Sequence, residues 1–183
     1  IVGAQVPIGT GIAFTHKYNG EKNICRTYIG DGAMNNGQVF EAFNLASLWK
    51  LPVLYIIENN KYGMGTSVNR AAAGSELYKR GIPFGIPGEL VDGMNVFKVI
   101  NAAHKAGKYV RESKGPYILE VQTYRYRGHS MSDPANYRTK EELESYKVND
   151  PIQIAHEQIL KKKIATEKEL VKINKEVIKK IKN

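Results

Sequence analysis

Two stretches decide the fold, ICRTYIGDGA at residues 24–33 and VLYIIENN at residues 53–60. Each is a run of β-branched and aromatic residues that ends in a short polar segment, which is typical of a buried strand leading into a loop. Residues 37–49 lie between them and carry apolar side chains with a period of about 3.6, which predicts a helix. A strand, a helix and a second strand with short connections predict a right-handed crossover and two parallel strands in one sheet.

The same pattern continues beyond these stretches. Residues 96–112 have helical spacing, and residues 117–123 form another apolar run that predicts a strand. Residues 61–90 are rich in Gly and Pro, so we expect loops there with one short helix. Strands that alternate with helices indicate an α/β fold. We therefore predict a mostly parallel sheet that is flanked by helices.

The C-terminal part of the chain has a different character. Residues 128–138 are rich in Ser, Gly, Asp, Pro and Asn, which marks a loop. Two helices are expected after this loop, and the last of them begins with a capping box at residues 166–169. We therefore predict an α/β domain at residues 1–138 and a C-terminal helical extension of that domain at residues 139–183.

Length and composition narrow the class of protein. A chain of 183 residues is long enough for one domain with a full core. It has no run of about 18 apolar residues that could span a bilayer. Cys25 is the only cysteine, which excludes an intrachain disulfide framework and favours a reducing, intracellular compartment. The chain starts at Ile1 without an initiator Met or a signal-like segment, so we expect it to be part of a longer protein.

The formal net charge is +9, which raises the question of a nucleic-acid partner. Two thirds of this excess lies in residues 161–183, where nine lysines and three glutamates give +6. No aromatic residue is interleaved with these lysines to stack on bases. A solvated helix face is the simpler interpretation, and we expect neither nucleic acid nor a membrane among the partners.

Polar residues follow both strands of the two deciding stretches. In open α/β sheets, ligands bind outside the carboxyl ends of the strands, so we expect Asp31 and Asn60 to face one crevice. Mg²⁺ prefers oxygen ligands, and it usually takes one or two from carboxylates and the rest from phosphates and water. The helix that follows Asp31 points its N-terminus at the same place, where it favours an anion. These residues have the chemistry to build a Mg²⁺-diphosphate site.

Each candidate residue also has a simpler structural role open to it. Asp31 lies between a strand and a helix, where an Asp often caps the helix. Asn59 and Asn60 are of a type that turns tolerate. Met64 is of a type that commonly fills a core, and His129 lies in a polar loop where surface histidines are common.

Four separate segments carry a family resemblance, and one of them contains a shorter motif. They are the GDG at residues 30–32, IVGAQVP at residues 1–7, ENNKYGMGTS at residues 58–67 with the NN at residues 59–60 inside it, and YRYRGHSMSDP at residues 124–134. A GDG that is followed, after a helix and a strand, by NN is similar to the thiamine-diphosphate signature. Together the segments resemble the alpha subunits of thiamine-diphosphate-dependent 2-oxoacid dehydrogenases across nearly the whole chain. The resemblance implies the thiamine-diphosphate-binding fold, with thiamine diphosphate and Mg²⁺ as cofactors.

The resemblance implies a role in metal and diphosphate binding for five residues. Asp31 and Asn60 would supply side-chain ligands to Mg²⁺, and Tyr62 would supply its backbone carbonyl. Gly32 and Ala33 would contact the diphosphate through their backbones.

Three further residues would contact other parts of the cofactor. By the same resemblance, Val2 would hold the aminopyrimidine through its main chain, and Met64 would form an apolar wedge under the bent cofactor. His129 would lie beside the diphosphate on the loop at the active-site entrance, as the catalytic residue of this chain.

The resemblance also implies partners. Family members take the glutamate that activates the aminopyrimidine from a beta subunit, so we expect a heterotetramer and no turnover by this chain alone. The sequence of residues 124–134 is most similar to that of the pyruvate-specific members. Those members decarboxylate pyruvate oxidatively and pass an acetyl group to a lipoyl domain. Branched-chain 2-oxoacid and acetoin dehydrogenases are the alternatives within the family.

One departure from the family bears on the compartment. Ser130 matches a serine that mitochondrial members phosphorylate, but residues 133–138 read DPANYR and lack the second phosphorylated serine of those members. This shorter sequence at residues 133–138 resembles that of the bacterial members. We therefore expect a bacterial cytoplasm, with the mitochondrial matrix as the alternative.

Two functions of another class stay open. A basic binding module would use the lysines of residues 161–182, and its affinity for nucleic acid would fall steeply with salt. A catalytically silent scaffold subunit would keep the fold without turnover, although intact Asp31, Asn60 and His129 argue against that function.

Overall fold

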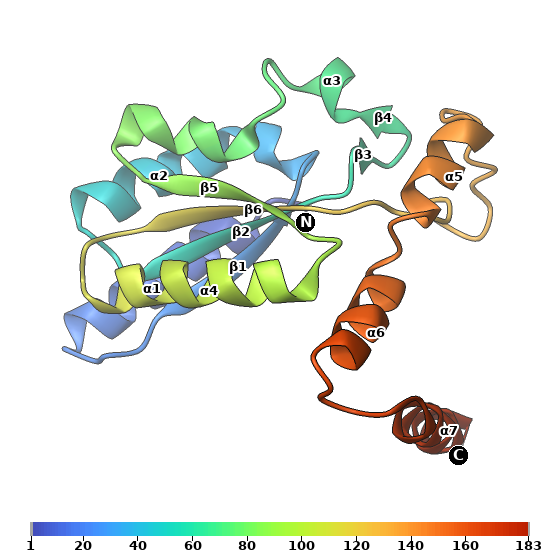
Figure 1. The fold of residues 1–183 in the computed structure, drawn as a ribbon. Coiled ribbons are helices and arrows are strands. Elements are labelled where there is room, and N and C mark those ends of the chain that lie inside the picture. The colour runs from blue at the N-terminus through green and yellow to red at the C-terminus, as the bar shows by residue number, and fades with distance from the viewer. Residues whose placement is uncertain (1, 183) are drawn as a thin grey trace.

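The structure, a computed structural model, describes residues 2–182. Its centre is a four-stranded sheet with the strand order β1-β2-β6-β5, in which all neighbouring strands are parallel (Figure 1). The strands are β1 (Cys25–Gly30), β2 (Val53–Asn59), β5 (Gly88–Asp92) and β6 (Tyr117–Gln122). The α/β class and the parallel sheet that the sequence predicts are confirmed.

The central strand β2 is buried on both faces, as its continuous apolar run predicts. Alternate side chains of β2 belong to two separate core clusters, one on each face of the sheet. Helices α1 (Gln5–Tyr18) and α2 (Gly37–Leu48) contribute to the first cluster, and α4 (Val96–Arg111) contributes to the second. The sheet therefore lies between helices on both faces, as Figure 1 shows.

Parallel pairing brings the carboxyl ends of three strands to the same edge of the sheet. Gly30 at the end of β1 pairs with Glu58, and Asn59 at the end of β2 pairs with Gln122 at the end of β6. The segments that follow β1 and β2 thus leave the sheet side by side, at the edge where α/β proteins bind ligands.

Residues 61–90 hold more regular structure than the sequence predicts. After β2 the chain forms a two-stranded hairpin from β3 (Tyr62–Gly63) and β4 (Thr66–Ser67). The short helix α3 (Val68–Ala71) and the 3-10 helix η2 (Leu77–Phe84) follow.

Strand β5 is a correction to the expected loops at residues 61–90. It is five residues long, begins directly after Pro87 and pairs with β6 at the edge of the sheet. A short edge strand is covered less completely than a central one, so its sequence carries a weaker apolar pattern.

Three helices close the chain, and the expectation of two was wrong. They are α5 (Lys140–Lys147), α6 (Pro151–Lys161) and α7 (Glu167–Lys182). Helix α5 has eight residues, none of them fully buried, so it lacks the apolar stripe by which a helix is found in a sequence. Its start is marked instead by Thr139, whose Oγ1 accepts a hydrogen bond of 3.1 Å from the backbone N–H of Glu142.

Helix α7 begins with the capping box that the sequence predicts. The backbone N–H of Thr166 donates to Glu169 Oε2 at 2.7 Å, and the backbone N–H of Glu169 donates to Thr166 Oγ1 at 3.4 Å. Figure 1 shows that α6 and α7 lead away from the sheet. None of the helices in residues 2–182 combines the length and the apolar character that crossing a membrane requires.

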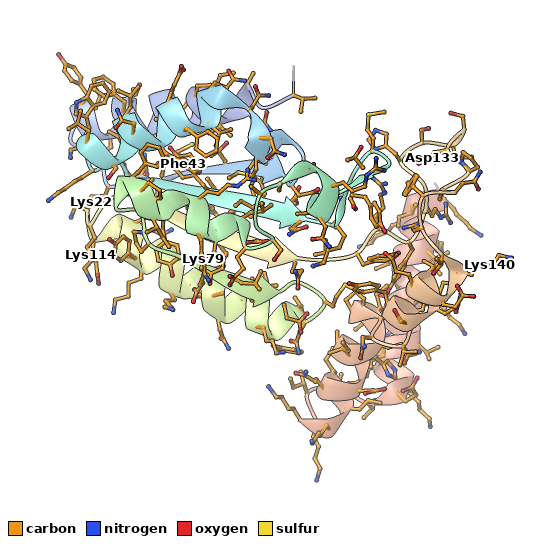
Figure 2. The ribbon with its side chains drawn as sticks, turned by 90° about the horizontal axis from the view of Figure 1, so that it is seen from above. Lys22, Phe43, Lys79, Lys114, Asp133 and Lys140 are labelled. Atoms are coloured by element: carbon orange, nitrogen blue, oxygen red, sulfur yellow. The ribbon has the colours of Figure 1, made fainter. Side chains whose placement is uncertain are left out.

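The larger core cluster centres on aromatic side chains, and its energetic weight can be measured at Phe43. Phe43, which is labelled in Figure 2, is fully buried. Its ring centroid lies 4.7 Å from that of Tyr55. We expect Phe43→Ala to lower the free energy of unfolding by about 3–5 kcal/mol, because the substitution leaves a cavity in a close-packed core. Denaturant titration measures this change.

The matched control is Leu48→Ala, at an exposed position of the same helix. This substitution is expected to change the free energy of unfolding by less than about 0.5 kcal/mol. Similar losses in the two variants would show that the aromatic cluster does not dominate the core.

Candidate functional site

The segments after β1 and β2 meet through two glycines. A Cβ added to Gly63 would lie 3.2 Å from the Cα of Gly32, and a Cβ added to Gly32 would lie 3.3 Å from the Cα of Gly63. The two backbones are therefore in direct contact, at a spacing that leaves little room for a side chain. The approach brings the GDG segment and the segment after Asn60 together, as the sequence predicts.

Asp31 lies at this contact with its side chain almost completely buried, at 4% exposure. Burial raises the pKa of its carboxyl group, and the negative charge of Glu120 adds to this rise. Hydrogen bonds from the backbone N–H groups of Asp31 and Asn60, and the positive charge of Arg125, oppose it. Asp31 also lines a cavity of about 240 Å³, together with Gly32 and Gly63.

The alternative role of Asp31 as a helix cap is not what the structure shows. The cap positions are Gly32, before the 3-10 turn Ala33–Asn35, and Asn36, before α2. Neither of these helices has a side-chain hydrogen bond at its N-cap. The carboxylate of Asp31 is thus not used as a cap.

Asn59 and Asn60 both make turn contacts, and they differ in burial. Asn59 is buried, its Nδ2 donates to Glu120 Oε1 at 2.7 Å, and its Oδ1 accepts from the backbone N–H of Lys61 at 3.1 Å. Asn60 is half-buried, and its Oδ1 accepts from the backbone N–H of Tyr62 at 3.2 Å. A carboxamide oxygen has two lone pairs, so Asn60 Oδ1 keeps capacity for a cation.

Tyr62 joins the hairpin to helix α5. Its hydroxyl donates to Glu142 at 2.9 Å and 3.0 Å from the two carboxylate oxygens, and the hydroxyl of Tyr124 donates to Glu142 Oε1 at 2.9 Å. Burial, followed by the hydrogen bond to Glu142, raises the pKa of Tyr62 to about 12. Helix α5 is thereby attached to the same turn that carries the candidate metal ligand.

Met64 and His129 are connected through Arg125. Arg125 Nη2 donates to the carbonyl oxygen of Met64 at 2.6 Å, and Arg125 Nη1 lies 3.4 Å from His129 Nδ1. Met64 lies in the β3–β4 turn with a positive φ of 55° and is 66% exposed. His129 is exposed on its loop. The loop that carries His129 therefore lies against the hairpin that carries Tyr62 and Met64.

Asp133 holds the His129 loop in shape. Its carboxylate accepts hydrogen bonds from the backbone N–H groups of His129 at 2.6 Å and Ala135 at 2.8 Å, and from the hydroxyl of Tyr137 at 2.8 Å. These donors lower the pKa of Asp133 to about 2. Figure 2 shows Asp133 at the end of the molecule that also carries α5.

The structure brings most of the expected residues together. Gly32 and Asp31 meet the segment of Asn60 and Tyr62 directly, and Ala33 follows at the buried start of the 3-10 turn. Val2 contacts the segment that follows this loop: it is 74% exposed, and its carbonyl oxygen accepts a hydrogen bond of 3.2 Å from Asn36 Nδ2 at the N-terminus of α2.

Two contributors to the site were not expected from the sequence, Arg125 and Glu120. Arg125 stands in a polar loop, where nothing in the local pattern distinguishes it from a surface residue. Glu120 does leave a signal, because it is a single charged residue inside the apolar run of residues 117–121. A charged side chain in such a strand is rarely buried without a partner.

The oxygen ligands at the carboxyl ends of β1 and β2 suit a hard divalent cation beside an anionic ligand. Within residues 2–182 no three His, Cys, Asp or Glu side chains cluster as metal ligands, so a site here must combine Asp31 with neutral oxygens. The carboxamide of Asn60 and backbone carbonyls supply such oxygens. The contact of Gly32 with Gly63 lets the backbone approach a ligand closely, which suits a diphosphate.

The sequence model of the dehydrogenase E1 component family matches residues 1–183, and the chain belongs to this family. Among its curated relatives are proteins named pyruvate dehydrogenase E1 component subunit alpha. The protein of Rickettsia felis is 61% identical over 97% of this chain and 54% of its own length. That of Rhizobium meliloti is 56% identical over 97% of this chain and 51% of its own length. The human somatic, mitochondrial form is 54% identical over 99% of this chain and 46% of its own length.

The chain spans about half the length of the curated relatives it matches. Among solved structures, an enzyme from Mycobacterium smegmatis described as thiamin diphosphate-dependent matches with a TM-score of 0.53 and 22% identity. The match covers 68% of this chain and 23% of that enzyme's chain. This likeness shows a shared fold.

The hydrogen bonds of Tyr62 to Glu142 predict how α5 responds to alkali. The pKa of Tyr62 rises from about 10 in an unfolded chain to about 12 in the fold. A raised pKa means that the neutral phenol is favoured by folding, so its contribution is complete below about pH 10 and is lost as the pH rises through about 12. We expect the protection of the α5 amides, relative to their intrinsic exchange rates at each pH, to fall over this interval, as measured by hydrogen exchange.

Tyr62→Phe is the variant that isolates this effect. It should expose the α5 amides already at neutral pH and should remove one tyrosine from the late part of a spectrophotometric titration, to which other tyrosines with a raised pKa, such as Tyr124, also contribute. Tyr18→Phe, at an exposed position of α1, serves as the control and should leave both observations unchanged. Equal α5 exchange in the wild type and in Tyr62→Phe would show that the contact does not hold the helix.

Proposed function

We propose that this chain is the cofactor-binding part of a pyruvate dehydrogenase E1 alpha subunit. The observation that carries the proposal is the meeting of Asp31-Gly32 with the segment from Asn60 to Gly63 at the carboxyl edge of two parallel strands. Identity of 61% to the Rickettsia felis alpha subunit supports it. The complete enzyme would decarboxylate pyruvate oxidatively and pass the acetyl group to the lipoyl domain of an acetyltransferase component.

The candidate metal ligands come from both strand ends. Asp31 and Asn60 would bind Mg²⁺ through side-chain oxygens, and Tyr62 would add its backbone carbonyl. This set matches the preference of Mg²⁺ for few protein oxygens and leaves places for diphosphate and water. A cation beside the buried carboxyl group of Asp31 would favour its charged form and so offset the burial that raises its pKa.

The other candidate residues would contact the organic part of the cofactor and its diphosphate. Gly32 and Ala33 would offer backbone groups to the diphosphate, Val2 would hold the aminopyrimidine by its main chain, and Met64 would lie under the bent cofactor. When bound, thiamine diphosphate supplies the carbanion chemistry that 2-oxoacid decarboxylation requires. His129 would act at the entrance, where Arg125 ties it to the Met64 turn.

The assembled enzyme would include a second kind of subunit. Glu58 adjoins the NN segment and is exposed, and it does not match the position of the glutamate that activates the aminopyrimidine in the family. A beta subunit in a heterotetramer would supply that group, and this chain alone would be inert. Residues 1–138 would form the thiamine diphosphate/Mg-binding domain, and residues 139–183 its helical extension.

The relatives also support a proposal for the compartment. Similarity to proteins of Rickettsia felis and Rhizobium meliloti supports a bacterial cytoplasm as the place of the assembled enzyme. The mitochondrial human relative supports the matrix as the alternative.

The cofactor site is tested by titrating thiamine diphosphate into the assembled enzyme with and without Mg²⁺, for the wild type and for Asp31→Asn. Binding to the wild type should require Mg²⁺, because the cation would be held by Asp31 and Asn60 and would offset the negative charge of the diphosphate. Asp31→Asn removes the charged ligand and should weaken binding at least about 100-fold, since outer-shell partners alone contribute about 10–100-fold in metal sites. Isothermal titration calorimetry measures both effects.

The matched control for this titration is Asp92→Asn. Asp92 also ends a parallel strand of the sheet, but its carboxylate pairs with Lys98 at 3.0 Å, away from the glycine contact. Cofactor affinity should be unchanged in this variant. Binding that is independent of Mg²⁺, or equally weak in both variants, would refute the assignment of the site.

The substrate is tested by comparing kcat/KM for pyruvate with the values for branched-chain 2-oxoacids and acetoin. We expect pyruvate to be preferred, because the alpha subunits with high identity to this chain are named for pyruvate. The measurement uses the assembled enzyme with a lipoyl-domain acceptor. A clear preference for a branched acid or for acetoin would move the chain to the corresponding branch of the family.

A further inference from the structure

Glu120 is a completely buried carboxylate in the middle of the sheet. It lies on β6 between β2 and β5, and its exposure is 0%. A charged side chain in such a place is costly unless hydrogen bonds satisfy it. Both oxygens are satisfied here: Oε1 accepts from Asn59 Nδ2 at 2.7 Å, and Oε2 accepts from the backbone N–H of Tyr78 at 2.9 Å.

The first of these hydrogen bonds fixes the direction of the Asn59 carboxamide. Because Nδ2 is held by Glu120, Oδ1 points to the backbone N–H of Lys61 and accepts from it at 3.1 Å. This bond shapes the turn that contains Asn60 and leads to Tyr62. Glu120 is therefore linked, through Asn59, to the turn that carries two candidate Mg²⁺ ligands.

The second hydrogen bond leads to the other loop of the site. Tyr78 belongs to η2, and Arg80 of the same helix donates to the carbonyl oxygen of Met34 at 2.8 Å and to Asn35 Oδ1 at 3.0 Å. Met34 and Asn35 belong to the 3-10 turn Ala33–Asn35, which directly follows Asp31 and Gly32. Glu120 is thus connected to both strand-end loops, to one through Asn59 and to the other through η2.

The charges near Glu120 are also arranged around the site. Glu120 and Asp31 both act on the half-buried ammonium group of Lys61, and the charge of Glu120 acts on Asp31 as well. The carboxylates of Asp31 in its loop and Glu120 on β6 therefore lie near the ammonium group of Lys61 in a partly desolvated space, where a further cation would be stabilised.

We propose that Glu120 is a positioning residue for the cation site, which it shapes by holding the Asn59 carboxamide and η2 in fixed directions. This inference rests on the proposed Mg²⁺-diphosphate function and adds a residue that does not itself contact the cofactor. A carboxylate is required because two N–H donors face it, and a carboxamide presents an acceptor at one of its two ends only. A purely structural role would lower stability and leave the need for Mg²⁺ unchanged.

The first test compares Glu120→Gln with the wild type and with Glu89→Gln in the assembled enzyme. Glu89 lies on the neighbouring strand β5 and is paired with Lys105 at 2.6 Å, so it is a matched loss of a carboxylate away from the loops. Calorimetric titration of thiamine diphosphate at a series of Mg²⁺ concentrations gives the Mg²⁺ concentration for half-maximal binding. We expect Glu120→Gln to raise it about 10–100-fold, and saturating Mg²⁺ to restore most of the binding, while Glu89→Gln leaves it unchanged.

A second variant keeps the inference testable if Glu120→Gln folds poorly. Asn59→Ala removes the intermediate side chain and keeps Glu120 with its bond to Tyr78. Asn59→Ala should also raise the Mg²⁺ concentration for half-maximal binding. Glu120→Gln should then have a smaller effect in the Asn59→Ala background than in the wild type, because the two residues act through one hydrogen bond.

The outcomes separate this inference from the proposed function. A wild-type enzyme that binds thiamine diphosphate without Mg²⁺, or not at all, overturns the proposed function and this inference with it. A wild type that requires Mg²⁺, with an unchanged requirement in Glu120→Gln or Asn59→Ala, overturns the role of Glu120 alone. Raised requirements in both variants, with Glu89→Gln at the wild-type value, support it.

Discussion

The pairing of β1 with β2 in one parallel register is the constraint on which the rest of the site depends. Gly30 stands opposite Glu58, so the GDG and NN segments leave the sheet at the same level and can touch. A slip by one residue would turn the alternate side chains of β2 to the wrong faces. Since both faces of β2 are packed with apolar side chains, the same burial that stabilises the sheet also holds Asp31 beside the Asn60 turn.

The elements that the sequence predicts correctly share a strong local pattern. Strand β2 is a continuous apolar run, β1 and β6 are rich in β-branched and aromatic residues, and α2 and α4 have clear helical periodicity. Strand β5 and helix α5 lack such patterns, because one is a short edge strand and the other buries no residue completely. Their formation depends on neighbours that are distant in sequence, which a local pattern does not contain.

The residues of the candidate site also fall into those that the sequence predicts and those that only the fold reveals. Asp31, Gly32 and Asn60 are predictable, since strand ends of an α/β sheet converge. The groups that hold them are not, because Tyr62 and Glu142 lie 80 positions apart and Asn59 and Glu120 lie 61 apart. A lone Glu in an apolar strand indicates that a partner exists, and only the fold identifies it as Asn59. Asn59 and Asn60 also have the turn contacts that were considered as their simpler role.

The contact between Gly32 and Gly63 limits how this chain can vary. At most packed positions, a larger side chain can be accommodated when a neighbouring side chain becomes smaller. Here the nearest atom that a new Cβ would meet is the Cα of the opposite glycine, and a backbone atom cannot be replaced by a smaller group. A substitution at one glycine therefore has no compensating substitution at the other. The two positions form a pair that can change only if the loops themselves move apart, and such a movement would also separate the oxygens that the loops carry.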